Sequence, residues 1–172
     1  ANTNKVGPVI GEVVNEYSAE ELAKMTVDEV NEIIRRDTYV NAFEEQRKNP
    51  QDYSGENLAE CVERVLYVCP ECKKVGTLHS KGNNLKCDCG YEVEMKSDGF
   101  FHDTGKGLYQ DNVLDWDLWQ RDIWKDMLLS AGDEAIVEEQ GQLIKTVDGE
   151  NEVILAENGT LRLYKDKFEI VT

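Results

Sequence analysis

The sequence lacks the features that mark several common functional classes. Its apolar runs fall well short of the roughly 18 residues that a helix needs to cross a bilayer, and no signal-peptide pattern is present. It also contains no phosphate-binding loop, no nucleophile elbow and no HExxH motif. The residues therefore give no local signature for a membrane span or for these kinds of catalysis.

Basic residues are scarce. The chain has 19 lysines and arginines against 35 acidic residues, for a net charge of −16. The acidic excess lies in residues 1–68 and 97–172, whereas residues 69–96 carry five basic and four acidic side chains. A surface of this kind repels nucleic-acid phosphates and anionic lipid headgroups, so neither is an expected partner of most of the chain.

Cysteine is the most informative residue type. Five cysteines are present, and four form two close pairs, Cys69/Cys72 and Cys87/Cys89, with fourteen residues between the pairs. Each pair can place two sulfurs on one side of a tight turn, and two such turns predict a tetrahedral site of four sulfurs. Because four thiolates leave no position for water, we expect structural rather than catalytic zinc, although iron fits the same donors.

The two histidines and the fifth cysteine are not expected to bind the metal. His79 and His102 lie near the cluster, and each could replace a thiolate, but with four cysteines present we expect both at the surface. Two thiol pairs without a βαβ context exclude a thioredoxin-like redox motif. The odd number of cysteines argues against a disulfide framework and indicates a reducing, cytoplasmic setting. The fifth, Cys61, is expected to be a small buried apolar residue within a helix.

The rest of the chain predicts an α+β fold. Two capping boxes, at Ser18/Glu21 and Thr26/Glu29, begin helices, and the second helix is expected to continue to Pro50. The expected divisions are a linker or extended segment (1–17), a helical region with its third helix at about 56–64 (18–64), a zinc ribbon (65–103), a connecting helix (111–130) and an antiparallel β domain (133–172).

Alternating apolar residues and turn signals place the strands. Within the ribbon we expect strands at 76–80, 84–86 and 91–95, with 100–102 extending or covering the small antiparallel sheet. The connecting helix carries an apolar stripe of core type, with Trp116, Trp119 and Trp124. The β domain is expected to be a meander of four or five strands at 134–137, 142–147, 152–156, 160–164 and 168–171, with tight turns at 148–149, 158–159 and 165–167. Such a meander is short for a closed barrel, and the chain begins without Met, so we expect a processed chain or a piece of a longer protein.

Three stretches together resemble the C-terminal region of bacterial 1-acyl-sn-glycerol-3-phosphate acyltransferases, a lysophospholipid acyltransferase family. They are NLAE-x-VERVLYVCPEC from Asn57, TLHSKGN-x-LKCDCGYEVE from Thr77 and DNVLDWDLWQRDI from Asp111. The upstream helices resemble the extension that joins the family's catalytic domain to its ribbon. The closing part, with NGTLRLYKDKFEI, is similar to the first strands of a pleckstrin-homology-like β domain, which implies a partial barrel. The resemblance covers most of residues 12–172.

The resemblance implies an accessory region without catalytic residues. The family's His-x-x-x-x-Asp signature uses Asp to orient a histidine base, but Asn84 and Gly107 stand where that Asp would follow His79 and His102. The family's Pro-Glu-Gly-Thr block is absent too. The implied partner is the catalytic acyltransferase domain of the same polypeptide, which would also bring the chain to the cytoplasmic face of the membrane.

One alternative stays open at this point, a zinc-ribbon module that binds nucleic acid or another protein. A small basic face would be formed by Lys73, Lys74, Lys81 and Lys86. The acidic flanks argue against nucleic acid.

Overall fold

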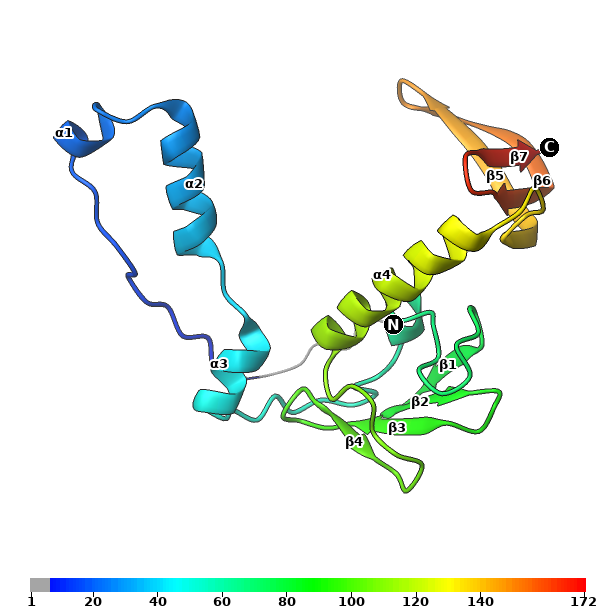
Figure 1. Ribbon diagram of the computed structural model, residues 1–172, viewed down its shortest axis with the longest axis horizontal. Helices are drawn as coiled ribbons and strands as arrows, with labels where there is room; N and C mark the ends of the chain where they lie inside the picture. Colours follow the sequence, from blue (N-terminus) through cyan, green and yellow to red (C-terminus); the bar gives the residue numbers. More distant parts are fainter. Residues whose placement is uncertain (1–6) are drawn as a thin grey trace. The chain divides into compact units, whose positions relative to one another are not determined.

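The computed structural model describes residues 7–172 and divides into two compact units, the first ending at Asp117 and the second beginning at Leu118. The fold is α+β, with N-terminal helices, a four-stranded antiparallel sheet, a helix and a three-stranded antiparallel meander (Figure 1). This confirms the predicted fold class. Among the described residues, no helix is both long and apolar enough to cross a membrane.

Three short helices open the chain. They are α1 (Ala19–Leu22), α2 (Val27–Thr38) and α3 (Ala42–Lys48). Both predicted capping boxes are present, with Glu21 bonding back to Ser18 and Glu29 to Thr26. The expectation of one helix from Thr26 to Pro50 is wrong, because two helices occupy this range. Asn41 adopts an extended conformation, and its side chain accepts hydrogen bonds from the backbone amides of the first turn of α3. Residues 7–17 form neither helix nor strand, and the first six residues of the predicted linker lie outside the described residues.

The helix predicted at about 56–64 is also wrong. The segment forms turns and a single 3₁₀ turn, η1 (Val62–Arg64). Asn57 and Cys61 have positive φ angles of 56° and 67°, which a right-handed helix cannot contain. Leu58, one of the apolar residues that suggested a helix, is instead buried in the first unit, as is Ala59.

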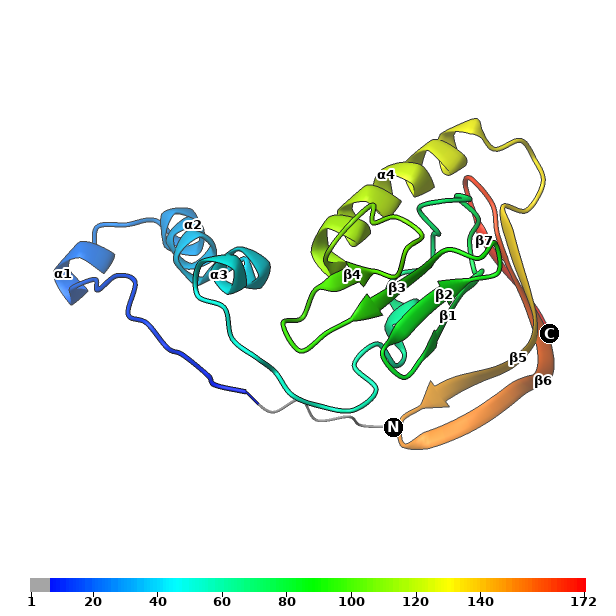
Figure 2. The ribbon, with the colours of Figure 1, turned by 90° about the horizontal axis from the view of Figure 1, so that it is seen from below.

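The central sheet follows the predicted strands. It consists of β1 (Leu78–Lys81), β2 (Asn84–Cys87), β3 (Glu92–Met95) and β4 (Phe101–Asp103), antiparallel in that order. Figure 2 shows the four strands side by side. Side chains alternate between the two faces, and the buried face carries Leu78, Leu85, Val93, Met95 and Phe101.

One tryptophan closes the core of this sheet. Trp116 lies in the first turns of α4 (Val113–Ser130) and is fully buried. Its indole N–H donates to the carbonyl oxygen of Val68 at 2.9 Å, and its ring lies 5.4 Å from Phe101 and 6.2 Å from Tyr91 between centroids. The predicted core role is thus confirmed for Trp116, while Trp119 and Trp124 are partly exposed.

The C-terminal meander has three strands where four or five were expected. They are β5 (Val137–Asp148), β6 (Asn151–Leu163) and β7 (Phe168–Val171). The turn predicted at 148–149 is present, since Asp148 pairs with Asn151. The turn predicted at Asn158–Gly159 is wrong, because Gly159 lies within β6 opposite Gln142. Register shifts between Glu139 and Lys145 absorb the irregular pairing of these long strands.

Gly159 is needed for close packing rather than for a turn. A Cβ atom there would lie 2.1 Å from Ile144 Cδ1 and 3.2 Å from the Val171 carbonyl oxygen. We expect Gly159→Ala to lower the free energy of unfolding of the β5–β7 sheet by about 1–3 kcal/mol, because the new methyl group overpacks the space that the buried Ile144 occupies. Hydrogen exchange of the β6 amides measures this loss.

The matched control is Gly132→Ala. A Cβ atom at Gly132 meets nothing within 4 Å, so this variant should leave β6 exchange unchanged. Equal protection of β6 in the two variants would show that Ile144 can move aside at no cost.

Candidate metal centre

The structure brings the four predicted cysteines together. Their sulfur atoms all lie within 4.8 Å of one another, with 3.8 Å between Cys69 and Cys89 and 3.7 Å between Cys72 and Cys87. All four are free thiols, and these separations far exceed the roughly 2.05 Å of a disulfide. The cluster could hold a metal ion such as zinc.

The first pair sits on a hairpin-like turn. Val68 forms an isolated bridge with Val75, and the Cys69 amide donates to the Lys74 carbonyl at 3.1 Å. The Lys73 amide donates back to the Cys69 carbonyl at 2.9 Å, and Lys73 reverses the chain with a φ of 57°. These bonds place the thiols of Cys69 and Cys72 on one side of the turn.

The second pair sits at the end of β2, on a tighter turn. The Cys87 amide donates to the Tyr91 carbonyl at 2.8 Å, and the Gly90 amide donates to the Cys87 carbonyl at 2.9 Å. Gly90 has a φ of 95°, a conformation that side chains other than glycine's rarely adopt. This left-handed residue closes the turn directly after Cys89, so one intervening residue is enough to bring both sulfurs to the same side.

One sulfur, Cys87 Sγ, has hydrogen-bond partners outside the cluster's sulfurs. The Cys89 amide donates to Cys87 Sγ at 3.5 Å, and Thr77 Oγ1 lies 3.1 Å from the same sulfur. Such contacts hold the sulfur in the orientation that a metal would meet. Thr77 was missed by the sequence reasoning. Its position depends on the pairing register of β1 and β2, which sets Leu78 opposite Cys87, and no local sequence pattern predicts that register.

Burial and neighbouring groups shift the pKa values of Cys69 and Cys72 in opposite directions. Burial raises the pKa of Cys69 well above its usual range. Burial also raises the pKa of Cys72, but the Lys74 amide and the neighbouring thiols outweigh it and bring the pKa of Cys72 down to about 7. Because metal ligation needs all four thiolates, a metal ion must displace protons from this cluster, and its binding therefore weakens at low pH.

The donor set fits tetrahedral zinc. Zinc–sulfur bonds of about 2.3 Å set the sulfurs of a regular tetrahedron about 3.8 Å apart, close to the 3.8 and 3.7 Å of two of the sulfur pairs, and all pairs lie within 4.8 Å. Four sulfurs complete the tetrahedron, so the arrangement can cross-link two turns but keeps no position for a substrate or water.

The other candidates lie outside the cluster. His79 is exposed and contacts Asp88 at 3.1 Å, and His102 contacts Asp98 at 2.8 Å. Within residues 7–172 the four cysteines are the one group of three or more metal-ligating side chains, and neither histidine belongs to it. Cys61 is only partly buried and lies in a turn, so its expected role as a buried residue within a helix is wrong.

The spatial closeness of each histidine to a carboxylate does not recreate the acyltransferase signature. Asp88 follows His79 by nine residues, and Asp98 precedes His102 by four. In both pairs the order or the spacing differs from His-x-x-x-x-Asp. No protein-family model and no solved structure matches this chain.

Proposed function

We propose that this chain is a non-catalytic module stabilised by structural zinc at Cys69, Cys72, Cys87 and Cys89. The observation that supports it is the spacing of the four sulfurs, none more than 4.8 Å from another. Bound zinc would supply four bonds that hold the two turns together. The protein contributes the turns, the hydrogen bonds to sulfur and the packed sheet beside them.

The test is the metal content of the protein as purified. We expect about one zinc per chain by elemental analysis, and loss of that zinc in Cys87→Ser. The matched control is Cys61→Ser, which removes a thiol outside the cluster and should keep the full zinc content. A folded chain that contains iron instead would keep the structural role and refute the choice of zinc. A folded chain with no metal would refute the proposal.

We further propose that the module serves as the C-terminal accessory region of a 1-acyl-sn-glycerol-3-phosphate acyltransferase, positioning the catalytic domain or binding a protein partner. Support comes from the resemblance in the cysteine turns and the tryptophan helix, and from the lack of the family's catalytic spacing at His79 and His102. Zinc would then act at a distance from the reaction by keeping the region folded.

Acyltransferase assays test whether the chain is accessory to a catalytic domain and has no activity of its own. The chain alone should show no turnover of lysophosphatidic acid with an acyl donor, and a polypeptide that carries a His-x-x-x-x-Asp domain ahead of residue 1 should turn it over. Turnover by the chain alone would refute the accessory role. Salt-dependent binding of mixed-sequence RNA or DNA in a shift assay would instead favour a nucleic-acid-binding ribbon.

A further inference from the structure

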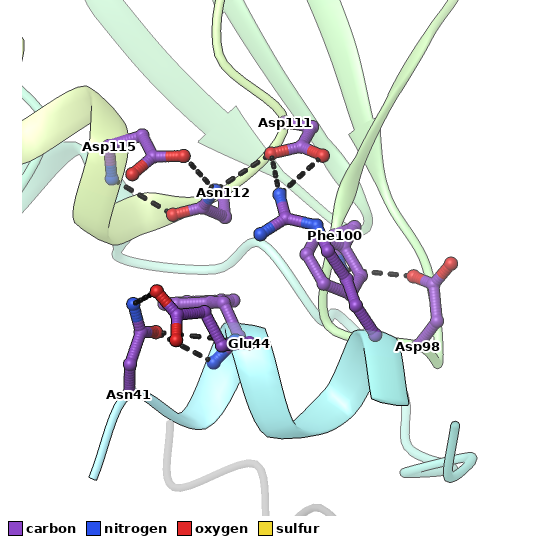
Figure 3. Close-up of polar contacts among 9 residues, drawn as sticks. Asn41, Glu44, Asp98, Phe100, Asp111, Asn112 and Asp115 are labelled. Carbon is purple, nitrogen blue, oxygen red and sulfur yellow. Dashed lines mark hydrogen bonds and ion pairs between the residues drawn. The ribbon is translucent and has the colours of Figure 1, made fainter. Parts of the chain in front are cut away.

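We propose that α3 is a releasable strap: it docks on the ribbon through Arg47 and Phe43, and it can undock while the ribbon stays folded. The strap consists of residues 42–48, and its receptor consists of Phe100 on the ribbon and Asp111, which lies between β4 and α4. Figure 3 shows both receptor residues beside α3. Residues 47 and 111 are 64 positions apart, so this contact joins α3 to a distant part of the first unit.

The docking contact is small and mostly exposed. Arg47 Nη2 donates to both carboxylate oxygens of Asp111 at 2.8 Å, and its guanidinium carbon lies 5.0 Å from the centre of the Phe100 ring. Phe43 adds a ring contact with Phe100 at 5.7 Å. The side chains of Arg47 and Asp111 are 46% and 38% exposed, so salt can screen their attraction.

Undocking of the strap costs few contacts. None of its residues is buried, and its other side-chain bonds are local: Asn41 caps the first turn, Lys48 pairs with Glu45, and Gln46 bonds to the backbone of Gln51. A helix of seven residues is marginal in water without a partner. Docking and helix formation are therefore coupled, and the order of α3 reports whether it is docked.

The receptor is held in place without the strap. The buried Asn112 donates to Asp111 Oδ1 at 2.7 Å, and the Phe101 amide donates to the Asp111 carbonyl at 2.7 Å. The Phe100 amide donates to Asp98 Oδ1 at 2.9 Å. Phe101, not Phe100, belongs to the core. Undocking thus uncovers the Phe100 ring and the Asp111 carboxylate but leaves the core intact.

A hinge lies shortly after the strap. The Tyr53 amide donates to the Ser97 carbonyl at 2.7 Å, and the Ser97 hydroxyl donates to Asp52 at 2.9 Å. These bonds fix the chain to the ribbon from residue 52 onward. The Gln46 side chain donates to the Gln51 carbonyl and accepts from the Gln51 amide, so residues 49–51 stay with α3. The pivot on which α3 and the helices before it move is therefore the junction between Gln51 and Asp52, as in local openings of low cost in other folded proteins.

The test is amide hydrogen exchange on the full zinc-loaded chain. Arg47→Met should lower the protection of amides 43–49 about 10-fold, because it removes an exposed ion pair and a cation–π contact while keeping helix propensity. The matched control is Lys48→Met, which removes a charge from the same turn but a partner only within α3, and should change this protection less than about 2-fold. In the unchanged protein, raising salt from about 0.05 to about 1 M should reproduce part of the Arg47→Met effect.

The ribbon amides decide whether the strap is separable. Amides of residues 78–95 should keep their protection in both variants and at both salt concentrations. Equal effects of the two variants on α3, or a parallel loss of protection in the ribbon, would overturn the proposal.

Discussion

Removal of the proposed zinc ion is expected to unfold the ribbon and leave the C-terminal meander folded. The ribbon builds its core from short strands of three or four residues, and small sheets of this kind are marginal alone. Structural zinc contributes on the order of 10 kcal/mol or more in zinc-finger peptides, which equals or exceeds the stability of a typical domain. The β5–β7 sheet contains none of the four ligands, so its pairing should survive.

Chelation followed by hydrogen exchange measures this effect segment by segment. Amides of β1, β2 and β3 should lose all protection in the metal-free chain and regain it when zinc is restored, and Cys69→Ser should behave like the chelated protein. Cys61→Ser supplies the control, because Cys61 lies outside the cluster. Native protection of β1–β3 in a chain shown to be free of metal would contradict the prediction.

Truncation of Trp116 should have the second-largest effect. We expect Trp116→Ala to lower the free energy of unfolding of the zinc-loaded ribbon by about 3–5 kcal/mol, from the cavity left by a fully buried indole. The loss in free energy includes the hydrogen bond that the indole N–H donates to the carbonyl oxygen of Val68. Urea unfolding at a fixed free zinc concentration measures the difference.

Two further variants separate ring packing from the hydrogen bond. Trp116→Phe keeps an aromatic ring against Phe101 and Tyr91 but removes the donor, so its cost should be about 1–3 kcal/mol. Leu118→Ala changes a residue two positions later that is 51% exposed, and it should stay within about 0.5 kcal/mol of the unchanged protein. A Trp116→Ala variant as stable as Leu118→Ala would show that the indole does not seal this core.

The sequence was sufficient for most of the structure that depends on neighbouring residues; the exception is the break before α3, where the local cap at Asn41 was missed. The ribbon strands were predicted because side chains alternate between two faces and turn residues separate them, as in Leu85 and Cys87 facing inward from β2. The cysteine cluster was predicted because two sulfurs one or two residues apart must share a side of a turn. Capping boxes worked for the same reason, since Ser18 and Glu21 are within one helical turn.

Prediction failed where distant parts of the chain decide the conformation. The segment around Cys61 has helical spacing in the sequence. The Cys61 amide nevertheless donates to the Ser80 hydroxyl of β1 at 2.8 Å, and the Cys61 backbone is left-handed. Asn158–Gly159 has the composition of a turn, but Ile144 from β5 fills the space over Gly159. The contact of Arg47 with Asp111 joins residues 64 apart, and no pattern in either segment indicates the other.

The burial of Trp116 gives the candidate metal centre an optical reporter. Its indole bonds to the carbonyl of Val68, the residue that precedes Cys69, whereas Trp119 and Trp124 are partly exposed. An indole in an apolar interior emits fluorescence at shorter wavelengths than one in water. Loss of the ion should therefore shift one of three emitters to the red, so that occupancy of the four thiols can be followed in real time without any added dye.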